Sequence, residues 1–106
     1  MNIFELRTYT LHVGKLNKAM EVYENLGWPA LKKYKKNIVR YYIGDVGALN
    51  QIIHVWQFKD DNSRRALWKT IYDDQDFLKF AAEFRPLVLT QENKLMTAAP
   101  WTPILN

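Results

Sequence analysis

The apolar and polar positions along the chain predict four β-strands. The clearest is residues 50–58, which are rich in β-branched and aromatic side chains and precede a turn-like run at residues 60–63. Because side chains alternate between the two faces of a strand, one face of this segment carries Ile52, His54, Trp56 and Phe58. Both faces are too apolar to lie mainly in water. The other strands are predicted at residues 3–10, 38–45 and 88–96.

Between the strands, apolar residues recur with the period of an α-helix. A first helix is predicted from about residue 15 to residue 26, with Gly27 as its stop, and a short helix follows Pro29. A second helical region is predicted at 63–72 and continues in an apolar stripe over 77–84 that ends at Pro86. The tail beyond residue 97 has no regular pattern. We expect its apolar residues, Trp101, Ile104 and Leu105, to dock against another surface.

The resulting order, β-α-β-β-α-β, predicts an α+β protein with the ferredoxin-like fold and a four-stranded antiparallel sheet. In that fold both helical regions cover one face of the sheet and leave the other bare. Phe4 and Leu6 suggest that their side of the first strand meets the helices. If the first and third strands are neighbours in register, the opposite face then carries Glu5, Arg7, Tyr9 and His54.

A bare sheet face that holds many aromatic residues is unfavourable on a monomer. An identical sheet is the simplest cover, and this predicts a homodimer in which two sheets pack face to face. The length of 106 residues predicts a single domain over 1–106. Hydrophobic residues make up 48% of the chain and charged residues 25%, the profile of a globular protein.

Several classes of protein are disfavoured by composition. No apolar run approaches the roughly 20 residues of a membrane span, and the N-terminal segment lacks the pattern of a targeting peptide, so we expect a cytoplasmic protein without membrane insertion. The absence of cysteine excludes disulfides and thiolate sites. Only His12 and His54 are available as histidine ligands, without metal-site spacing, and we expect neither a metal nor another cofactor.

Nucleic-acid binding is also disfavoured. The net charge of +4 is modest. The RNA-recognition fold has the same strand order, and Tyr9, Trp56 and the lysines at 32–36 invite the comparison. The third strand, however, lacks the expected basic-glycine-aromatic pattern, and Glu5 and His54 are poor platform residues.

The candidate chemistry lies on the face that carries His54. A histidine titrates near neutral pH, so His54 or Glu5 is a candidate for proton transfer, while Arg7 or Tyr9 would stabilise a developing enolate. Five further residues are candidates for contact with a ligand: Trp56, Tyr42, Phe58, Asn50 and Glu92. The alternative is a structural network that only satisfies buried polar groups inside the dimer.

Three segments resemble the NIPSNAP family. They are Phe4-Glu5-Leu6-Arg7-Thr8-Tyr9-Thr10-Leu11 with Gly14-Lys15, Asn50-Gln51-Ile52-Ile53-His54-Val55-Trp56, and Gln91-Glu92-Asn93 ahead of Pro100. The resemblance implies a ferredoxin-like domain that pairs as a dimeric α/β barrel. The wider superfamily includes cofactor-free monooxygenases, muconolactone isomerases, polyketide cyclases and haem-degrading enzymes, and the resemblance implies no single reaction among them.

Two hypotheses therefore stand side by side. In the first, the protein is a homodimer with an internal pocket for a small, largely apolar ligand, on which it performs cofactor-free acid–base or monooxygenase-type chemistry. In the second, it is a non-catalytic interaction module whose polar sheet-face residues only hold the dimer together. A closed cavity of a few hundred Å³ at His54 would favour the first, and a filled, fully hydrogen-bonded interface would favour the second.

Overall fold

A computed structural model describes residues 2–103 of the chain. It contains four strands, and helical segments lie between β1 and β2 and between β3 and β4. The strands are β1 (Ile3–Leu11), β2 (Ile38–Ile43), β3 (Gln51–Phe58) and β4 (Val88–Thr97). The predicted single domain, 1–106, extends past the described residues at both ends.

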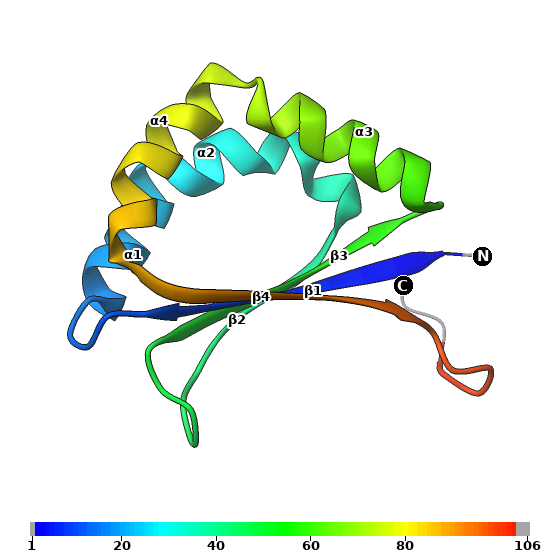
Figure 1. Cartoon of the computed structure of the whole chain (residues 1–106), viewed down its shortest axis with the longest axis horizontal. Helices are drawn as coiled ribbons and strands as arrows, with labels where there is room; N and C mark the ends of the chain where they lie inside the picture. The colour runs from blue at the N-terminus through cyan, green and yellow to red at the C-terminus, as the bar shows by residue number, and fades with distance from the viewer. Residues whose placement is uncertain (1, 104–106) are drawn as a thin grey trace.

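The strands form one antiparallel sheet in the order β2-β3-β1-β4. This is the predicted ferredoxin-like arrangement, and the helices lie together on one side of the sheet (Figure 1). In the pairing of β1 with β3, Arg7 lies opposite His54 and Glu5 lies opposite Trp56. Directly opposed residues point to the same face of a sheet. The prediction that Glu5, Arg7, Tyr9 and His54 share one face is therefore confirmed.

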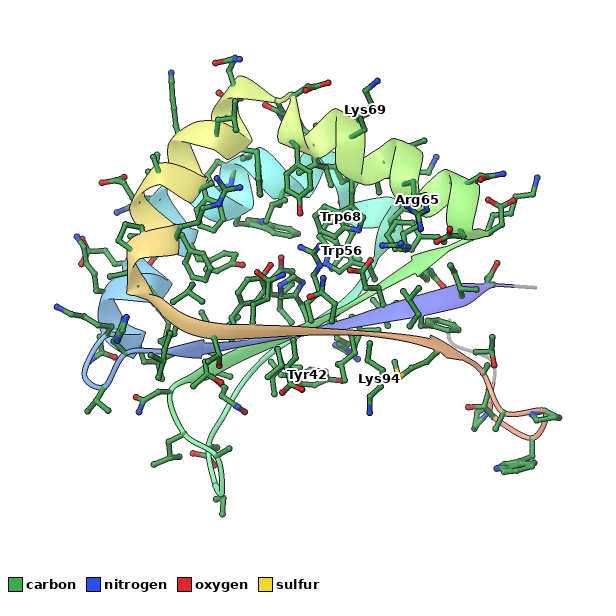
Figure 2. The ribbon with its side chains drawn as sticks, in the orientation of Figure 1. Tyr42, Trp56, Arg65, Trp68, Lys69 and Lys94 are labelled. Atoms are coloured by element: carbon green, nitrogen blue, oxygen red, sulfur yellow. The ribbon has the colours of Figure 1, made fainter. Side chains whose placement is uncertain are left out.

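The predicted position of that face was wrong. We expected the helices to cover Phe4 and Leu6, but they cover the opposite side, where Glu5, His54 and Trp56 are buried. Figure 2 shows Trp56 between the sheet and the helices, and Tyr42 beyond the far side of the sheet. On that side the core packs around Ile52, Trp56 and Phe58. The helices bring the Trp68 indole and the Tyr72 phenol, which hydrogen-bond to Glu5 and Arg7. The uncovered face has only partly buried residues on its central strands, including Phe4, Leu6, Ile53 and Val55.

The first helical region is continuous where a break was predicted. It runs through α1 (Leu16–Val22), a π-helical turn η1 (Tyr23–Gly27), α2 (Trp28–Leu31) and a 3-10 segment η2 (Lys32–Asn37). Gly27 has helical dihedral angles and does not end the helix. A Cβ atom there would lie 2.7 Å from both the Phe80 and the Tyr23 ring. Its missing side chain lets the helical segments approach closely, which is why glycine sits at this position.

The second helical region follows the prediction. It consists of α3 (Asp61–Tyr72) and α4 (Gln75–Phe84), followed by a short 3-10 turn η3 (Arg85–Leu87). Aspartates begin both helices, since the Asp60 carboxylate accepts a hydrogen bond from the Ser63 N–H and the Asp74 carboxylate accepts one from the Asp76 N–H. These two caps fix the helices over the sheet with their aromatic stripes facing inward.

An irregularity in β2 brings one more aromatic residue to the covered face. The pairing with β3 shifts between Ile38 and Arg40, so that one extra residue is inserted in β2. Tyr41 consequently lies opposite His54 and packs against the core, as Ile38 does. Tyr42 lies opposite Ile53 on the uncovered face and is 53% exposed.

The uncovered face carries a groove at its edge, which the tail helps to line. The groove is lined by Phe4, Val39, Val55 and Met96 from the sheet, and by Thr102 and Pro103 from the tail. Trp101 itself is 85% exposed. The predicted docking of Ile104 and Leu105 falls outside the described residues. The predicted sheet-to-sheet dimer stays a prediction.

Candidate functional site

A cavity of about 270 Å³ lies between the sheet and the helical layer. Its walls come from all four strands and from both helical regions, so it forms only when the whole fold is assembled. Most of its lining is aromatic. The residues that line it are Arg7, Tyr9, Tyr23, Leu31, Tyr41, His54, Trp56, Trp68, Tyr72, Phe77, Phe80, Ala81, Phe84, Arg85, Val88 and Gln91.

His54 lies at the centre of the sheet wall and is only 2% exposed. Its imidazole ring is held between two tyrosines from the neighbouring strands. The Tyr41 ring lies 4.4 Å from it at an interplanar angle of 11°, and the Tyr9 ring lies 5.2 Å from it at 8°. This sandwich fixes the plane of the imidazole, so its ring edge keeps one orientation.

One hydrogen bond determines which nitrogen of His54 carries the proton. The Trp56 indole Nε1–H donates to His54 Nδ1 over 2.6 Å. An indole nitrogen can only donate, so Nδ1 accepts, and in the neutral ring the proton must sit on Nε2. Burial, and secondarily the positive charge of Arg7, lower the pKa of His54 to about 3. The imidazole is therefore neutral at physiological pH, and its free nitrogen is a hydrogen-bond donor.

This geometry changes the role expected for His54. The sequence suggested a proton-transfer group with a pKa near neutrality. In the structure its only lone pair is already used by Trp56, and the ring is too weak a base to hold a second proton at pH 7. His54 is suited to donate a hydrogen bond from Nε2 to an oxygen atom.

Glu5 is the other candidate for proton transfer, and it too is fully engaged. Its side chain is 0% exposed. The carboxylate accepts hydrogen bonds from Arg7 Nε over 2.8 Å, from Trp68 Nε1 over 2.9 Å and from Arg64 Nη1 over 3.3 Å. Glu5 does not line the cavity. Its position indicates that it orients Arg7 and Trp68 rather than contacting a ligand.

Arg7 connects this network to the cavity. Its guanidinium lies 3.8 Å from the centre of the Trp68 ring, and it donates to the hydroxyl oxygens of Tyr9 over 3.0 Å and Tyr72 over 3.3 Å. Burial acts to lower the pKa of Arg7, but the neighbouring Tyr9 and the hydrogen bonds to Glu5 and Tyr72 outweigh it and raise the pKa. Arg7 is a permanent positive charge at the cavity wall.

Two polar atoms in this wall lack a hydrogen-bond partner. They are the Tyr41 hydroxyl and His54 Nε2, both buried. Buried polar atoms are nearly always paired, so an unpaired donor in the wall of a cavity indicates a ligand or water position. Burial raises the pKa of Tyr41 well above its usual value, so its hydroxyl remains protonated.

The predicted ligand-contact residues are only partly gathered here. Trp56 lines the cavity, and Phe58 is buried behind it with its ring stacked on Trp56. The other three lie elsewhere. Tyr42 and Glu92 are exposed on the uncovered face, and Asn50 sits in a turn with a φ of 60° and accepts the Leu11 N–H through its carbonyl oxygen.

The helical half of the site was not predicted as functional. Trp68, Phe77, Phe80 and Phe84 belong to the helical regions predicted at 63–72 and 77–84, and they pack in the core while also lining the cavity. Tyr72 was missed in the same way. The available signal was the presence of hydroxyl and indole groups within otherwise apolar helical stripes, since such groups need buried partners.

Two further features concern metal binding and membranes. Among the described residues, no cluster of three or more His, Asp or Glu side chains is placed to bind a metal ion. Within residues 2–103, no helix is both long enough and apolar enough to cross a bilayer.

Comparison with known proteins identifies relatives over the full described length. The sequence model of the NIPSNAP family matches residues 4–103. No curated protein sequence matches. A crystal structure of a NIPSNAP family protein of unknown function from Agrobacterium tumefaciens is 29% identical, with a TM-score of 0.90 over 98% of this chain and 94% of that one.

Two other crystal structures, each 23% identical, show the same fold. A second NIPSNAP family protein from Agrobacterium tumefaciens has a TM-score of 0.92 over 99% of this chain and 100% of its own. The cofactor-independent oxygenase SnoaB from Streptomyces nogalater has a TM-score of 0.61 over 97% of this chain and 98% of its own.

Proposed function

The chain belongs to the NIPSNAP family, and on that premise we propose that it binds a small, largely apolar ligand in the cavity at His54 and acts on it without a cofactor. The observation that carries the proposal is the cavity of about 270 Å³ with two unpartnered polar atoms in its wall. A site that only held the fold together would be filled and fully hydrogen-bonded.

The lining supports a small, ring-shaped ligand. Ligand sites are mostly apolar with a few placed polar groups, and here aromatic rings surround His54, Arg7 and Tyr41. The volume lies just below the range of roughly 300–1,000 Å³ that is usual for drug-sized ligands. A compound of one or two rings suits the space.

The chemistry that the site supports is stabilisation of negative charge on an oxygen atom. The His54 Nε2–H, the Tyr41 hydroxyl and the Arg7 guanidinium are hydrogen-bond donors that are themselves largely buried, and such interactions are strongest away from water. The oxygenase from Streptomyces nogalater shares the fold, and this makes oxygen uptake without a cofactor the first reaction to assay.

We also propose that the protein is a homodimer in which the uncovered sheet faces pack together. The support is the apolar character of that face, where Phe4, Leu6, Ile53 and Val55 are held only partly buried by the chain itself. Sheet-on-sheet packing would bury these side chains. The cavity lies on the other side of the sheet, so each subunit would carry its own complete site.

One observation favours the competing interaction module. Glu5 is satisfied by Arg7, Arg64 and Trp68, so part of the polar face already forms a complete structural network. If that network were the whole purpose of the polar residues, the cavity would bind nothing. The two functions differ in whether the purified protein retains or accepts a small molecule.

Native mass spectrometry of freshly purified protein tests the proposal, because it reports the number of subunits and any retained ligand together. The matched variants are Ala81→Leu, which fills the cavity, and Ala82→Leu, which adds the same volume at an exposed neighbouring position. We expect the wild type and Ala82→Leu to carry a bound mass, or to be stabilised against heating by aromatic probes, and Ala81→Leu to lose both. A wild type that binds none of the probes would support the interaction module instead.

A further inference from the structure

We infer that the cavity binds its ligand as an oxyanion, and that the ligand is a planar compound of one or two rings with an ionised phenol or enol. This inference rests on the proposed function, because it names the chemical class of the ligand in the same cavity. It follows from three properties of the wall: its buried polar groups, on Arg7, Tyr41 and His54, are placed to donate, its charge is positive, and its rings are flat and fixed.

The first property concerns the two unpartnered atoms. His54 presents Nε2–H because Nδ1 is occupied by the Trp56 indole. The Tyr41 hydroxyl makes no hydrogen bond of acceptable geometry, although the neighbouring Tyr23 hydroxyl is close enough to affect its pKa. Both groups can donate to a ligand oxygen in the cavity, and a deprotonated oxygen, which has no proton of its own to place, is the best acceptor for such donors.

Hydrogen bonds from Arg7 leave two further tyrosine hydroxyls able to act as donors. A guanidinium has no acceptor, so the hydroxyl oxygens of Tyr9 and Tyr72 must accept from it, over 3.0 Å and 3.3 Å. Their own O–H protons are then directed away from Arg7. Both residues line the cavity, and burial raises the pKa of Tyr9, so this phenol stays protonated.

The second property is the sign of the charge. Among the described residues no carboxylate lines the cavity, whose titratable groups are Arg7, Tyr9, Tyr23, Tyr41, His54, Tyr72 and Arg85. Behind the wall, ion pairs connect Arg7, Glu5, Arg64, Asp61 and Arg65 in a chain. The outer pair, Arg65 and Asp61, is largely exposed, whereas the inner part sets the Arg7 and Arg64 guanidinium groups against the one buried carboxylate of Glu5. The positive sign of the wall therefore comes from Arg7, beside which an anionic ligand would be favoured.

The third property is the shape of the wall. Tyr9, His54 and Tyr41 stand as three nearly parallel rings on the sheet. Tyr23, Phe80 and Phe84 form the facing group, with ring centres 4.7–5.2 Å apart. A planar ligand can stack or meet these rings edge to face without displacing them, whereas a bulky aliphatic ligand would have to push them aside.

The cavity wall also lacks a basic group, and this limits which ligands can bind as anions. His54 is neutral with its lone pair occupied, Glu5 is outside the cavity, and burial raises the pKa of Tyr9, Tyr23 and Tyr41, so these phenols hold their protons. The ligand must therefore ionise without help from a carboxylate or imidazole. A hydroxyl acidic enough to ionise near neutral pH, such as that of a conjugated phenol or enol, meets this requirement.

The probe for the test is 7-hydroxycoumarin, a two-ring phenol whose anion absorbs at longer wavelength than its neutral form. Its methyl ether, 7-methoxycoumarin, has nearly the same shape and cannot ionise. We expect the protein to bind the anion at least tenfold more tightly than the ether. The apparent pKa of the bound dye should then fall by about one unit. Equal binding of both dyes with an unshifted dye pKa would overturn the inference while leaving the proposed pocket standing. Binding of neither dye would overturn the inference and count against the pocket as well.

Matched variants distinguish the loss of a hydrogen-bond donor from the loss of folding. Tyr41→Phe removes a hydroxyl that has no partner in the protein, so folding is retained, while the preference for the anion should fall about tenfold. Tyr42→Phe removes the hydroxyl of the next residue, which lies on the uncovered face away from the cavity, and should leave the binding and the pKa of the dye unchanged. An unchanged dye pKa shift in Tyr41→Phe, with wild-type thermal stability, would contradict the assignment of Tyr41 as a donor to the oxyanion.

Discussion

At the scale of single residues, the functional behaviour of the site is determined by which hydrogen bonds are already made. His54 is an ordinary histidine in the sequence, but Trp56 occupies one nitrogen and burial removes its charge. Glu5 is similarly changed by three donors into a structural anion. Each effect can be tested by one substitution.

Replacing Glu5 by glutamine should destabilise the protein strongly. The substitution removes the charge that pairs with Arg7, and breaking one partner of a buried ion pair costs about 3–5 kcal/mol. Urea unfolding monitored by tryptophan fluorescence measures the loss. Glu83→Gln, an isosteric change at an exposed position of α4, is the control and should shift the midpoint little. Equal midpoints for both variants would contradict a structural role for Glu5.

The stability of the protein should fall as the pH drops below neutrality, because of His54. Its pKa is about 3 in the folded chain and about 6.5 in an unfolded one, so between these values the unfolded chain binds more protons. The free energy of unfolding therefore decreases as the pH falls from about 6.5 towards 3, by up to about 1.4 kcal/mol per pH unit. Chemical denaturation at pH 6.5, 5.5 and 4.5 measures this slope.

The control for that slope is His54→Gln, which keeps an acceptor for the Trp56 indole but cannot be protonated. It should flatten the pH dependence over this interval. Burial opposes ionisation of Asp74, but hydrogen bonds from Lys33 and Tyr34 lower the pKa of its carboxyl group to about 2. Asp74 therefore contributes to the pH dependence of stability only at lower pH. A slope that survives in His54→Gln would assign the pH dependence to other groups.

At the scale of elements, the first helical region continues through Gly27 because of how it packs, not because of the helix propensity of its residues. Gly27 was predicted to end the first helix, and it instead lies where α4 crosses η1. The irregularity in β2 acts in a similar way, because it places both Ile38 and Tyr41 on the covered face. In both cases a small local change decides which aromatic rings can reach the cavity.

Gly27→Ala tests the close approach of the two helical regions. Alanine favours a helix over glycine by about 1 kcal/mol, but here its Cβ would meet the Phe80 and Tyr23 rings at 2.7 Å. Overpacking costs about 1–3 kcal/mol, so we expect net destabilisation. Asn25→Ala, at an exposed position of the same turn, should be neutral or slightly stabilising. A more stable Gly27→Ala protein would show that the rings move aside freely.

At the scale of the whole molecule, the two faces of the sheet differ in what they contact. One face and the helices enclose the cavity, and the other carries partly buried apolar residues that one chain does not cover. Figure 2 shows Tyr42 and Lys94 on this second side. The proposed dimer would use that face and leave the cavity untouched, so assembly and ligand binding can be separated experimentally.

Ile53→Lys should convert the proposed dimer into a folded monomer. Ile53 points to the uncovered face beside Thr8 and Tyr42, and a buried lysine there would be left without a partner. Sedimentation equilibrium gives the mass, and circular dichroism reports folding. Leu78→Lys, at an exposed position of α4, is the control and should leave assembly unchanged. A monomeric wild type would remove the dimer from the proposal.

The order of the elements, and which residues of one strand share a face, follow from the amino-acid sequence alone, whereas the register of the first and third strands was only assumed. Period-two alternation put Glu5, Arg7 and Tyr9 together, and the pairing of β1 with β3 added His54. These properties are local, because they depend on neighbouring positions of one strand and on short connections. The resemblance to the NIPSNAP family pointed to the same fold and family, and both were confirmed.

The tertiary structure alone decided which face the helices cover, and with it the identity of the cavity. Alternation says that odd and even residues of a strand point to opposite sides, but not which side receives the helices. That choice depends on whether the helical side chains can satisfy buried polar groups, as Trp68 does for Glu5 and Tyr72 does for Arg7. These contacts join positions more than sixty residues apart, and no pattern within a single segment contains them.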